Sequence, residues 1–417
     1  MDQKLQVSIL KDLLQQIDSG RNKDAGVQYK VPTSIYADPA LAEQEWEHFF
    51  QNHPQMIGLS GDLPEPNSFL TLNDFGVPII ATRDKEGTFR AFLNVCRHRA
   101  TRVETEPRGK RKLFVCPFHA WSYSTSGDLV AIADKSDFGD VDTSCRGLTE
   151  LPAVESAGLL FVHPKPDGEL DVEKLLGTKL HQELASIGFE DFVFGAEKTI
   201  DKKLNWKLAN DTFGETYHFQ KLHKDTLGQL FIGNNTHLEE FGRHHRFTTA
   251  NLAIHEMREL PEEDWQIQKA TFVGYHLFPN IQMFWSGDTV SLVRIYPDAT
   301  NPGRSVSQVS IYFTQEAHAQ AMAMDEDARK QAVADTYKFN EGAVRSPSIE
   351  ASLEVFTSTI EYEDYVMGEY QQKAAESGLA GEAIFGRNEP VLHHFHRSYR
   401  EALGMPHFEA IKPKELV

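Results

Sequence analysis

Apolar and polar positions recur at different spacings in different parts of the chain, and these spacings predict its secondary structure. Residues 1–45 start with apolar side chains at helical intervals, which predict a helix, followed by an extended stretch and a second short helix. Residues 46–165 instead contain short β-rich runs with turn residues between them. The clearest turn is 84–87, whose sequence DKEG predicts a β-hairpin. The strands expected in this segment are 77–84, 88–95, 113–118 and 158–163.

Prolines and a glycine at 164–168 end the β-rich segment, and a region with a different pattern of apolar and polar residues follows. Residues 166–417 combine strands of alternating polarity with long helical stretches. The pattern therefore predicts an α+β chain, with a small all-β domain at 46–165 and a larger α+β domain at 166–417. The strands expected in the larger domain are 192–200, 280–285, 290–296 and 306–313, and the helices are 205–220, 316–340 and 348–376.

The charge balance excludes some classes of partner. With 61 Asp and Glu against 42 Lys and Arg, the chain has a formal net charge of −19, which would repel nucleic acid and anionic membranes. No apolar stretch approaches the roughly 20 residues that span a bilayer, and charges interrupt the N-terminal helix too often for a signal peptide. Three cysteines are too few for a disulfide framework and indicate a reducing compartment. We therefore expect a cytoplasmic protein.

Two short segments carry metal-binding side chains. Cys96 and His98 form a Cys-x-His pair, and Cys116 and His119 form a Cys-x-x-His pair after seventeen intervening residues. Two cysteines and two histidines suit a tetrahedral zinc ion, although the second zinc pair is usually His-His. They also suit a [2Fe–2S] cluster in which one iron has two thiolate ligands and the other has two imidazoles. Each segment here supplies one thiolate and one imidazole, which favours the cluster.

The residues around these ligands favour the cluster further. The sequences NVCRHRA and CPFHAWSYSTSGDL resemble the two cluster loops of the Rieske family, which read N-x-C-x-H-R-G and C-P-x-H-G-W-x-Y. The resemblance implies an N-terminal Rieske domain in which the two cysteines bind one iron and the two histidines bind the other. The chain departs from the family pattern at Ala100 and Ala120, where glycine is usual, and a methyl group there requires slightly relaxed loops.

A second candidate metal site lies in the segment NWKLANDTFGETYHFQKLHKDTL. His218 and His223 are five residues apart, about 140° on a straight α-helix, so they can share an ion only if the helix ends or bulges between them. Glu215, three residues before His218, would lie beside it on a helix. Two imidazoles and one carboxylate form the facial triad of non-haem Fe(II) oxygenases. The alternative is a pair of ordinary histidines on a helix surface or in the core.

The third ligand would have to be a carboxylate far along the chain. The candidates are Glu361, Glu363 and Asp364, which lie beside an apolar helical stripe. Glu361 points away from the stripe, while Glu363 and Asp364 flank it on opposite edges. Periodicity alone therefore does not choose between Glu363 and Asp364.

Both segments resemble the Rieske non-haem iron oxygenases of the large-subunit type. In that family N-W-K opens the iron segment, an acid-x-Tyr-His sequence precedes a second histidine, and an acid–Asp pair followed by glutamine supplies the third ligand. The resemblance implies that His218, His223 and Asp364 bind the iron. It also implies that Glu215 is the acid that bridges a cluster histidine to an iron histidine, a position where most members have aspartate. The second domain would then be a catalytic domain with an antiparallel sheet surrounded by helices.

The function implied by the resemblance is reductive activation of O₂ at a mononuclear Fe(II), with hydroxylation of a small organic substrate. Electrons from NAD(P)H would reach the cluster through a separate reductase, with or without a ferredoxin, because the chain has no visible glycine-rich dinucleotide loop. Family members form head-to-tail homotrimers in which the electron passes from one subunit's cluster to its neighbour's iron, and we expect the same assembly here.

The sequence is less informative about the substrate. We expect ring hydroxylation of an aromatic acid or hydrocarbon. Oxidative demethylation, or oxidation of a quaternary ammonium compound, is the alternative within the family, and the glutamate at position 215 favours it. The remote alternative is a Rieske electron carrier without oxygenase activity, which the large second domain and its histidines oppose.

Two further histidine tracts do not have the spacing of a known metal site, and we interpret them as structural or surface histidines. The tracts consist of His244 and His245, and of His393, His394 and His396.

Overall fold

The computed structural model describes residues 1–335 and 348–412, and residue contacts divide the chain into two units. The small unit is Glu45–Val193, and the large unit combines Met1–Gln44 with Phe194–Val417. The small unit consists mainly of strands and the large unit combines a sheet with helices, so the predicted α+β fold is confirmed. No helix in the described ranges has the length and apolar character needed to cross a membrane.

The small unit contains a five-stranded sheet of order β10-β5-β4-β3-β6 and two three-stranded sheets, β11-β12-β2 and β7-β8-β9. β7 is shorter than the strand predicted at 113–118, because the chain enters a loop at Cys116. The strands are β2 (Gln55–Leu59), β3 (Ser68–Leu72), β4 (Ile79–Arg83), β5 (Phe89–Leu93), β6 (Arg108–Lys110), β7 (Leu113–Val115), β8 (Ser122–Ser124), β9 (Leu129–Ala131), β10 (Glu150–Leu151), β11 (Ala153–Ser156) and β12 (Leu159–Val162). The helices are α3 (Lys135–Phe138), α4 (Val172–Leu176) and α5 (Thr178–Ala185).

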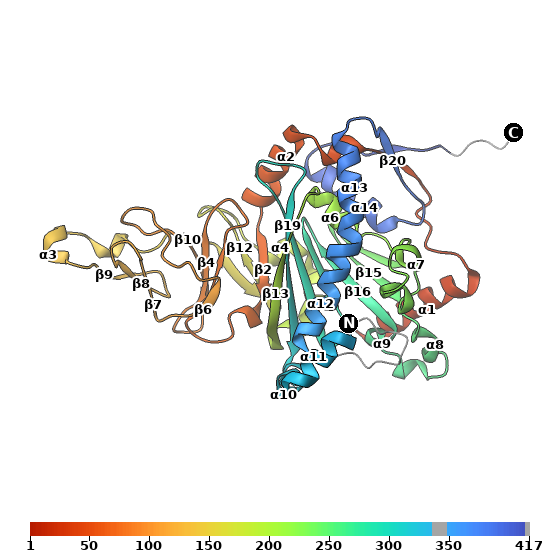
Figure 1. Ribbon diagram of the computed structural model, residues 1–417, viewed down its shortest axis with the longest axis horizontal. Helices are drawn as coiled ribbons and strands as arrows, with labels where there is room; N and C mark the ends of the chain where they lie inside the picture. The colour runs from red at the N-terminus through yellow and green to blue at the C-terminus, as the bar shows by residue number, and fades with distance from the viewer. Residues whose placement is uncertain (336–347, 413–417) are drawn as a thin grey trace. The chain divides into compact units, whose positions relative to one another are not determined.

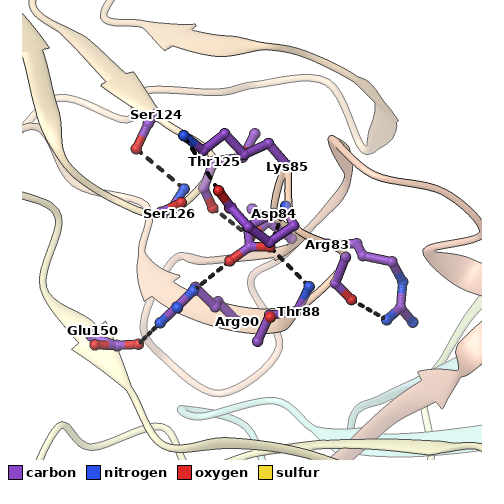
Figure 2. Close-up of polar contacts among 12 residues, drawn as sticks. Arg83, Asp84, Lys85, Thr88, Arg90, Ser124, Thr125, Ser126 and Glu150 are labelled. Carbon is purple, nitrogen blue, oxygen red and sulfur yellow. Dashed lines mark hydrogen bonds and ion pairs between the residues drawn. The ribbon is translucent and has the colours of Figure 1, made fainter.

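β4 and β5 form the hairpin that the turn sequence predicts (Figure 2). Gly87 has a φ of 87°, a conformation that glycine adopts easily. The carboxylate of Asp84 is buried in the turn and accepts hydrogen bonds from the backbone N–H groups of Glu86 at 3.0 Å and Thr88 at 2.8 Å. Its second oxygen accepts from Arg90 Nε at 2.8 Å. Burial opposes ionisation, but these bonds outweigh it and lower the pKa of Asp84.

The large unit is organised on a seven-stranded sheet of order β13-β19-β18-β17-β16-β15-β14, in which β14 to β19 are antiparallel neighbours. All four strands predicted in this region are present, and the hydrophobic pattern missed β14, β15 and β16. The strands are β13 (Phe192–Lys202), β14 (His237–Phe241), β15 (His244–Ala250), β16 (Thr271–Leu277), β17 (Ile281–Trp285), β18 (Thr289–Pro297) and β19 (Ser305–Thr314).

Helices pack against this sheet, with α12 on β19, α6 on β18 and β19, and α14 on β15. α12 and α13 follow one another, joined by a π-helical turn at Ile360–Asp364 (Figure 1). The helices of this region are α6 (Trp206–Asp211), α7 (Phe219–Leu222), α8 (Ile254–Met257), α9 (Ile267–Ala270), α10 (Gln315–Ala323), α11 (Glu326–Asp335), α12 (Ile349–Thr359), α13 (Tyr365–Glu376) and α14 (Pro390–Ala402).

Two of the predicted helices are wrong in extent. The helix predicted at 205–220 ends at Asp211, and turns follow as far as α7. Gly214 lies in these turns, where a β-carbon would come within 2.2 Å of the Leu392 side chain. The helix predicted at 316–340 is interrupted at Met324, because Asp325 accepts a hydrogen bond from the backbone of the next helix, α11. Residues 336–340 of that prediction lie outside the described residues.

The start of the chain forms part of the large unit. α1 (Gln3–Ser19) buries one apolar face and contacts α9, β14 and β15. β1 (Tyr29–Pro32) pairs with β20 (Glu382–Phe385) and β21 (Glu409–Ala410), two strands from the opposite end of the sequence. The short helix predicted before residue 50 is present as α2 (Pro39–Glu45), which a π-helical turn extends.

Candidate metal centres

The two cysteine–histidine segments of the small unit form loops with the same backbone turn. In the first loop the N–H of Cys96 donates to the carbonyl of Thr101 at 2.7 Å, and the N–H of Ala100 donates to the carbonyl of Cys96 at 3.0 Å. The second loop repeats both bonds around Cys116, at 2.8 and 2.9 Å. Each loop therefore presents one thiol and one imidazole from the same local geometry.

Ala100 and Ala120 close these turns with φ values of 59° and 55°. This left-handed conformation carries a steric cost for any residue with a β-carbon, and glycine adopts it freely. The preference for glycine at both positions of the resembling family has this backbone origin. The loops of this chain take the same turn with a methyl group in place.

The donor atoms of the loops fit an iron–sulfur cluster. Cys96 and Cys116 are buried thiols in the core of the small unit, and burial raises the pKa of Cys116. The Nδ1 atoms of His98 and His119 are also buried and make no hydrogen bond to the described residues. The two imidazole rings lie with centroids 4.6 Å apart. Buried nitrogen atoms without a partner are uncommon, and a bound metal would satisfy both.

The ligand types also fit a cluster in this arrangement. One thiol and one imidazole from each loop suit two irons with separate ligand pairs, with two thiolates on one iron and two imidazoles on the other.

Tyr123 is a functional candidate that sequence reasoning missed. Its hydroxyl lies 3.3 Å from Sγ of Cys96 and accepts a hydrogen bond from the backbone N–H of Arg97 at 2.9 Å. Since that N–H occupies the acceptor side of the hydroxyl, the hydroxyl proton is free to point to the sulfur. Its place in the pattern C-P-x-H-x-W-x-Y was the available signal, but the pattern does not reveal the contact.

In the large unit, His218 and His223 share a site because the helix between them lasts one turn. His218 precedes α7 and His223 follows it with non-helical φ and ψ of −92° and 24°. This is the helix ending that the spacing argument required. The two Nε2 atoms lie 3.1 Å apart.

Asp364 completes the group from the π-helical turn. Its Oδ1 lies 3.4 Å from Nε2 of His218 and 3.1 Å from Nε2 of His223, and its side chain is buried. Ligands about 2.1 Å from a common ion at angles of 90–110° lie about 3.0–3.4 Å from one another. The three atoms therefore have the spacing of ligands on one face of a metal ion.

The two neighbouring acids have other partners. Glu361 forms an ion pair with Lys198, with Oε2 and Nζ 2.9 Å apart. Glu363 Oε2 lies 2.7 Å from Nδ1 of His223 and accepts a hydrogen bond from Thr226 Oγ1 at 3.0 Å. Sequence reasoning considered Glu363 only as a rival ligand and missed its contact with a predicted ligand.

Glu215 contacts His218 as predicted, with Oε1 2.5 Å from Nδ1. The reason differs from the prediction, because Glu215 lies in the irregular segment between α6 and α7 and not on a helix one turn before His218. Its Oε2 accepts hydrogen bonds from the backbone N–H groups of Tyr217 and His218 and so caps the approach to α7. Both histidines therefore have a carboxylate at Nδ1, which fixes the ring orientation.

These contacts control protonation of the metal-free site. Burial disfavours charged imidazole, but the hydrogen bonds that His218 donates to Asp364 and Glu215 outweigh it and raise the pKa of His218 to about 10. The pKa of His223 is raised for the same reason, against burial and mainly by Asp364. The two histidines in turn lower the pKa of Asp364, although burial opposes this. The raised pKa values favour positively charged imidazoles, and a divalent cation would replace their positive charge.

Phenylalanine rings extend from this site across the sheet. Phe219 contacts His223 with ring centroids 5.4 Å apart and Phe231 at 6.2 Å. Phe231 contacts Phe272 at 5.4 Å, and Phe272 stacks on Phe284 at 4.7 Å. The surroundings of the site are therefore rich in aromatic faces.

The two other histidine tracts meet in the interior, on β15 and α14, and all five of their histidines are buried. The Nδ1 atoms of His245 and His394 lie 2.8 Å apart, and His245 stacks on His276 with ring centroids 4.9 Å apart. Burial lowers the pKa of His245 and His276 well below the usual range. Neutral stacked rings agree with a structural role.

Comparison with protein families gives two matches. Residues 189–405, more than half of the chain, match the ring hydroxylating alpha subunit (catalytic domain), and residues 53–145 match the Rieske [2Fe-2S] domain. The two matches confirm the predicted iron–sulfur and mononuclear iron domains.

Curated relatives have several activities. The chain is 32% identical over 209 residues to the glycine betaine monooxygenase oxygenase subunit of Chromohalobacter salexigens, which covers 50% of this chain and 46% of the relative. It is 29% identical over 200 residues to the anthranilate 1,2-dioxygenase large subunit of Acinetobacter baylyi, covering 47% and 42%. It is 23% identical over 290 residues to the carnitine monooxygenase oxygenase subunit of Escherichia coli, covering 69% and 76%. The matched part spans about half the length of the first two relatives.

Solved structures share the fold. The quaternary ammonium Rieske monooxygenase CntA in complex with L-carnitine has a TM-score of 0.70 at 19% identity, covering 92% of this chain and 97% of that chain. Naphthalene 1,2-dioxygenase from Rhodococcus sp. bound to indole has a TM-score of 0.63 at 19% identity, covering 95% and 98%. The fold of this chain, with the predicted antiparallel sheet and its surrounding helices, therefore matches these two solved structures over nearly their whole length.

Proposed function

Because this chain belongs to the family of ring-hydroxylating alpha subunits, we propose that it is the terminal oxygenase component of a Rieske non-haem iron system. The observation that carries the proposal is the convergence of two imidazole nitrogens and one carboxylate oxygen in a chain that also has a Rieske domain. A non-catalytic electron carrier would have no use for the second site.

His218, His223 and Asp364 would hold the mononuclear iron in this proposal, as a set of two imidazoles and one carboxylate. Ferrous iron supplies the reductive activation of O₂, and the cluster supplies electrons one at a time. Glu215 and Glu363 keep the Nδ1 protons of the two histidines in place. The lone pairs at Nε2 then face the ion.

Electrons reach the cluster from NAD(P)H through a separate reductase, with or without a ferredoxin. The chain assembles as a homotrimer in which Glu215 accepts a hydrogen bond from the cluster histidine His119 of a neighbouring subunit. Nδ1 of His119 is buried without a hydrogen bond to any described residue, so in this proposal it binds the cluster and Nε2 makes the contact. Phe118, which precedes His119, and Tyr217, two residues after Glu215, are 52% and 63% exposed, and a subunit contact would cover these apolar surfaces.

The substrate class that we propose is a quaternary ammonium compound, the alternative within the family. The glycine betaine and carnitine relatives support this class, and so does the glutamate at 215. Aromatic faces such as Phe219 and Phe231 can hold a trimethylammonium group by cation–π attraction. The acidic chain, with a net charge of −19, attracts cations and fits a cytoplasmic location.

For an N-methyl substrate the balanced reaction is oxidative demethylation. One oxygen atom of O₂ enters a C–H bond of the methyl group, and the other leaves as water after uptake of two electrons and two protons. The hydroxymethyl product breaks its C–N bond and releases formaldehyde. The reductase supplies the two electrons.

An aromatic acid is the second candidate substrate, as first expected from the family resemblance. The match to the anthranilate dioxygenase large subunit supports it. The same phenylalanine rings could stack on an aromatic ring.

Oxygen uptake with a surrogate reductase and NADH tests the proposal. Glycine betaine or carnitine should stimulate uptake, and demethylation should release one formaldehyde for each O₂ consumed. Stimulation by anthranilate alone would support the second candidate. Protein that contains the cluster but binds no mononuclear iron would contradict the oxygenase function itself.

A further inference from the structure

A cavity of about 440 Å³ lies in the large unit among the N-terminal segment, β14, α14 and the residues that follow α14. Its volume is in the range of small-molecule sites. None of its lining residues is a candidate metal ligand. Apolar and aromatic side chains form part of the wall, among them Val27, Tyr29, Leu238 and Phe408.

Arg400 places a buried cation in this wall. Only 8% of its surface is exposed, and its guanidinium lies over the ring of Phe408 at 4.4 Å. Its Nε donates to the carbonyl of Pro406. Within the described part of the chain, no carboxylate pairs with this guanidinium. Buried charges are normally paired, so the remaining donors of Arg400 lack the anion that such a group requires.

His393 gives a second, independent indication of a ligand. It is 8% exposed, it lines the cavity, and its Nε2 is buried without a hydrogen bond to any described residue. Nε2 is therefore left as an unsatisfied polar atom in the wall.

The acids that line the cavity already have cationic partners. Glu240 pairs with Arg397, with Oε2 and Nη2 2.6 Å apart, and Asp24 pairs with Arg387. Lys23 is exposed among the lining residues and forms no ion pair within the described ranges. Lys23 and Arg400 therefore give the cavity an unbalanced positive charge in a chain whose net charge is −19.

We propose that this cavity binds a small organic carboxylate. The planar guanidinium of Arg400 matches a carboxylate group, which it can hold through paired N–H donors. Tyr29 and Phe408 contact the organic part of the ligand, Nε2 of His393 makes a second polar contact, and Lys23 attracts the anion at the rim. The site does not depend on the iron centre and goes beyond the proposed oxygenase function.

Calorimetric titration of the purified, metal-loaded protein with glutarate tests this proposal. Saturable binding is expected, with none for glutaramide, which has the same skeleton without charges. Loss of a hydrogen bond to a charged group corresponds to about ten- to hundredfold in affinity, which is the effect expected for Arg400→Gln. Because Arg400 is buried and its replacement could disturb folding, the exposed Lys23→Glu provides the second test, with an expected loss of about fivefold or more.

The matched control is Lys4→Glu, which makes the same charge change on another exposed lysine of the N-terminal segment. It should leave glutarate affinity unchanged. Equal affinities in Lys23→Glu and Lys4→Glu would overturn the proposal, and would assign any carboxylate binding to the iron site or to another surface. Binding of inorganic phosphate but not glutarate, with the same dependence on Lys23, would overturn the assigned ligand class.

Discussion

Glu363 lies 2.7 Å from Nδ1 of His223, so the residue beside the third candidate iron ligand orients the second one. The π-helical turn at Ile360–Asp364 makes this possible, because it directs two consecutive acids to the same histidine. Glu215 does the same for His218 from a different part of the chain. A carboxylate at Nδ1 thus orients each imidazole so that its Nε2 faces the metal position.

Glu363→Gln should weaken iron binding while leaving the protein folded. Partners behind a metal-binding histidine typically contribute about 10–100-fold to metal affinity or activity. The amide keeps one acceptor oxygen but loses the charge, so we expect a loss within that range, measured by metal titration and steady-state turnover. Glu361→Gln is the matched control, since Glu361 pairs with Lys198, and its metal affinity should equal that of the unmodified protein.

Asp364→Ala and His218→Ala should each abolish turnover and mononuclear iron while preserving the visible absorption and reducibility of the cluster. The reason is that each change removes one of three converging donor atoms and leaves the small unit untouched. Metal analysis together with optical spectra checks both results. Iron and activity retained in Asp364→Ala but lost in Glu363→Ala would mean that the ligand is Glu363.

Glu215→Gln should separate metal binding from electron transfer. Glutamine keeps the size of the side chain and one acceptor, so both iron centres should assemble. Reoxidation of the reduced cluster in the presence of O₂ and substrate should slow by about tenfold or more, because the charged link to His218 is gone. Rapid-mix spectroscopy follows this reoxidation, and an unchanged rate at unchanged metal content would place the electron path elsewhere.

Iron affinity should rise with pH. The pKa of His218 in the metal-free site is about 10, so its imidazole is protonated near neutrality and must lose that proton to bind a metal. Each released proton strengthens the apparent affinity by about tenfold per pH unit below that pKa. Anaerobic Fe(II) titrations between about pH 6 and 9 measure the slope. A flat profile would contradict the protonated site.

The same raised pKa predicts how the free energy of unfolding of the metal-free protein depends on pH. The fold raises the pKa of His218 from its usual 6.5 to about 10, so the stabilisation that its protonation gives is complete below pH 6.5 and is lost as the pH rises through about 10. Denaturant unfolding of metal-free protein measures this loss. In His218→Ala the corresponding part of the pH dependence should disappear.

Tyr123→Phe should lower the reduction potential of the cluster. A hydrogen bond to a thiolate ligand stabilises the reduced, more negative state, and Tyr123 is placed to donate one to Cys96. A net hydrogen bond of about 0.5–1.5 kcal/mol corresponds to about 20–60 mV for one electron. Voltammetry of the two proteins measures the shift, and an equal or higher potential in the variant would show that the hydroxyl does not donate to the sulfur.

Local pattern predicted most of what depends on neighbours in sequence. The cluster segments, the strand at 306–313 and the hairpin at 84–87 are all properties of short stretches, and each is present in the fold. The rule that a helix must end between His218 and His223 was also correct. Spacing on a regular helix was enough to derive it.

The remaining features depend on contacts that no regular period describes. An ideal α-helix places Glu363 and Asp364 on opposite edges, whereas the π-helical turn brings both to His223. The helix predicted through Glu215 ends at Asp211, and beyond it Gly214 leaves no room for a β-carbon beside Leu392 of α14, a contact between segments far apart in the sequence. The contact of Tyr123 with Cys96 likewise joins strand β8 to the first cluster loop, two segments that only the fold brings together.

The pairing of β1 with β20 and β21 makes the small unit an insertion within the large one. The chain starts in the large unit, leaves it after Gln44 and returns to it at Phe194. An N-terminal truncation up to Gln44 would therefore remove strand partners from the iron-binding unit and leave the cluster-binding residues intact. Conversely, the electron-carrying module could be exchanged between homologues as one cassette, provided that both of its junctions are cut.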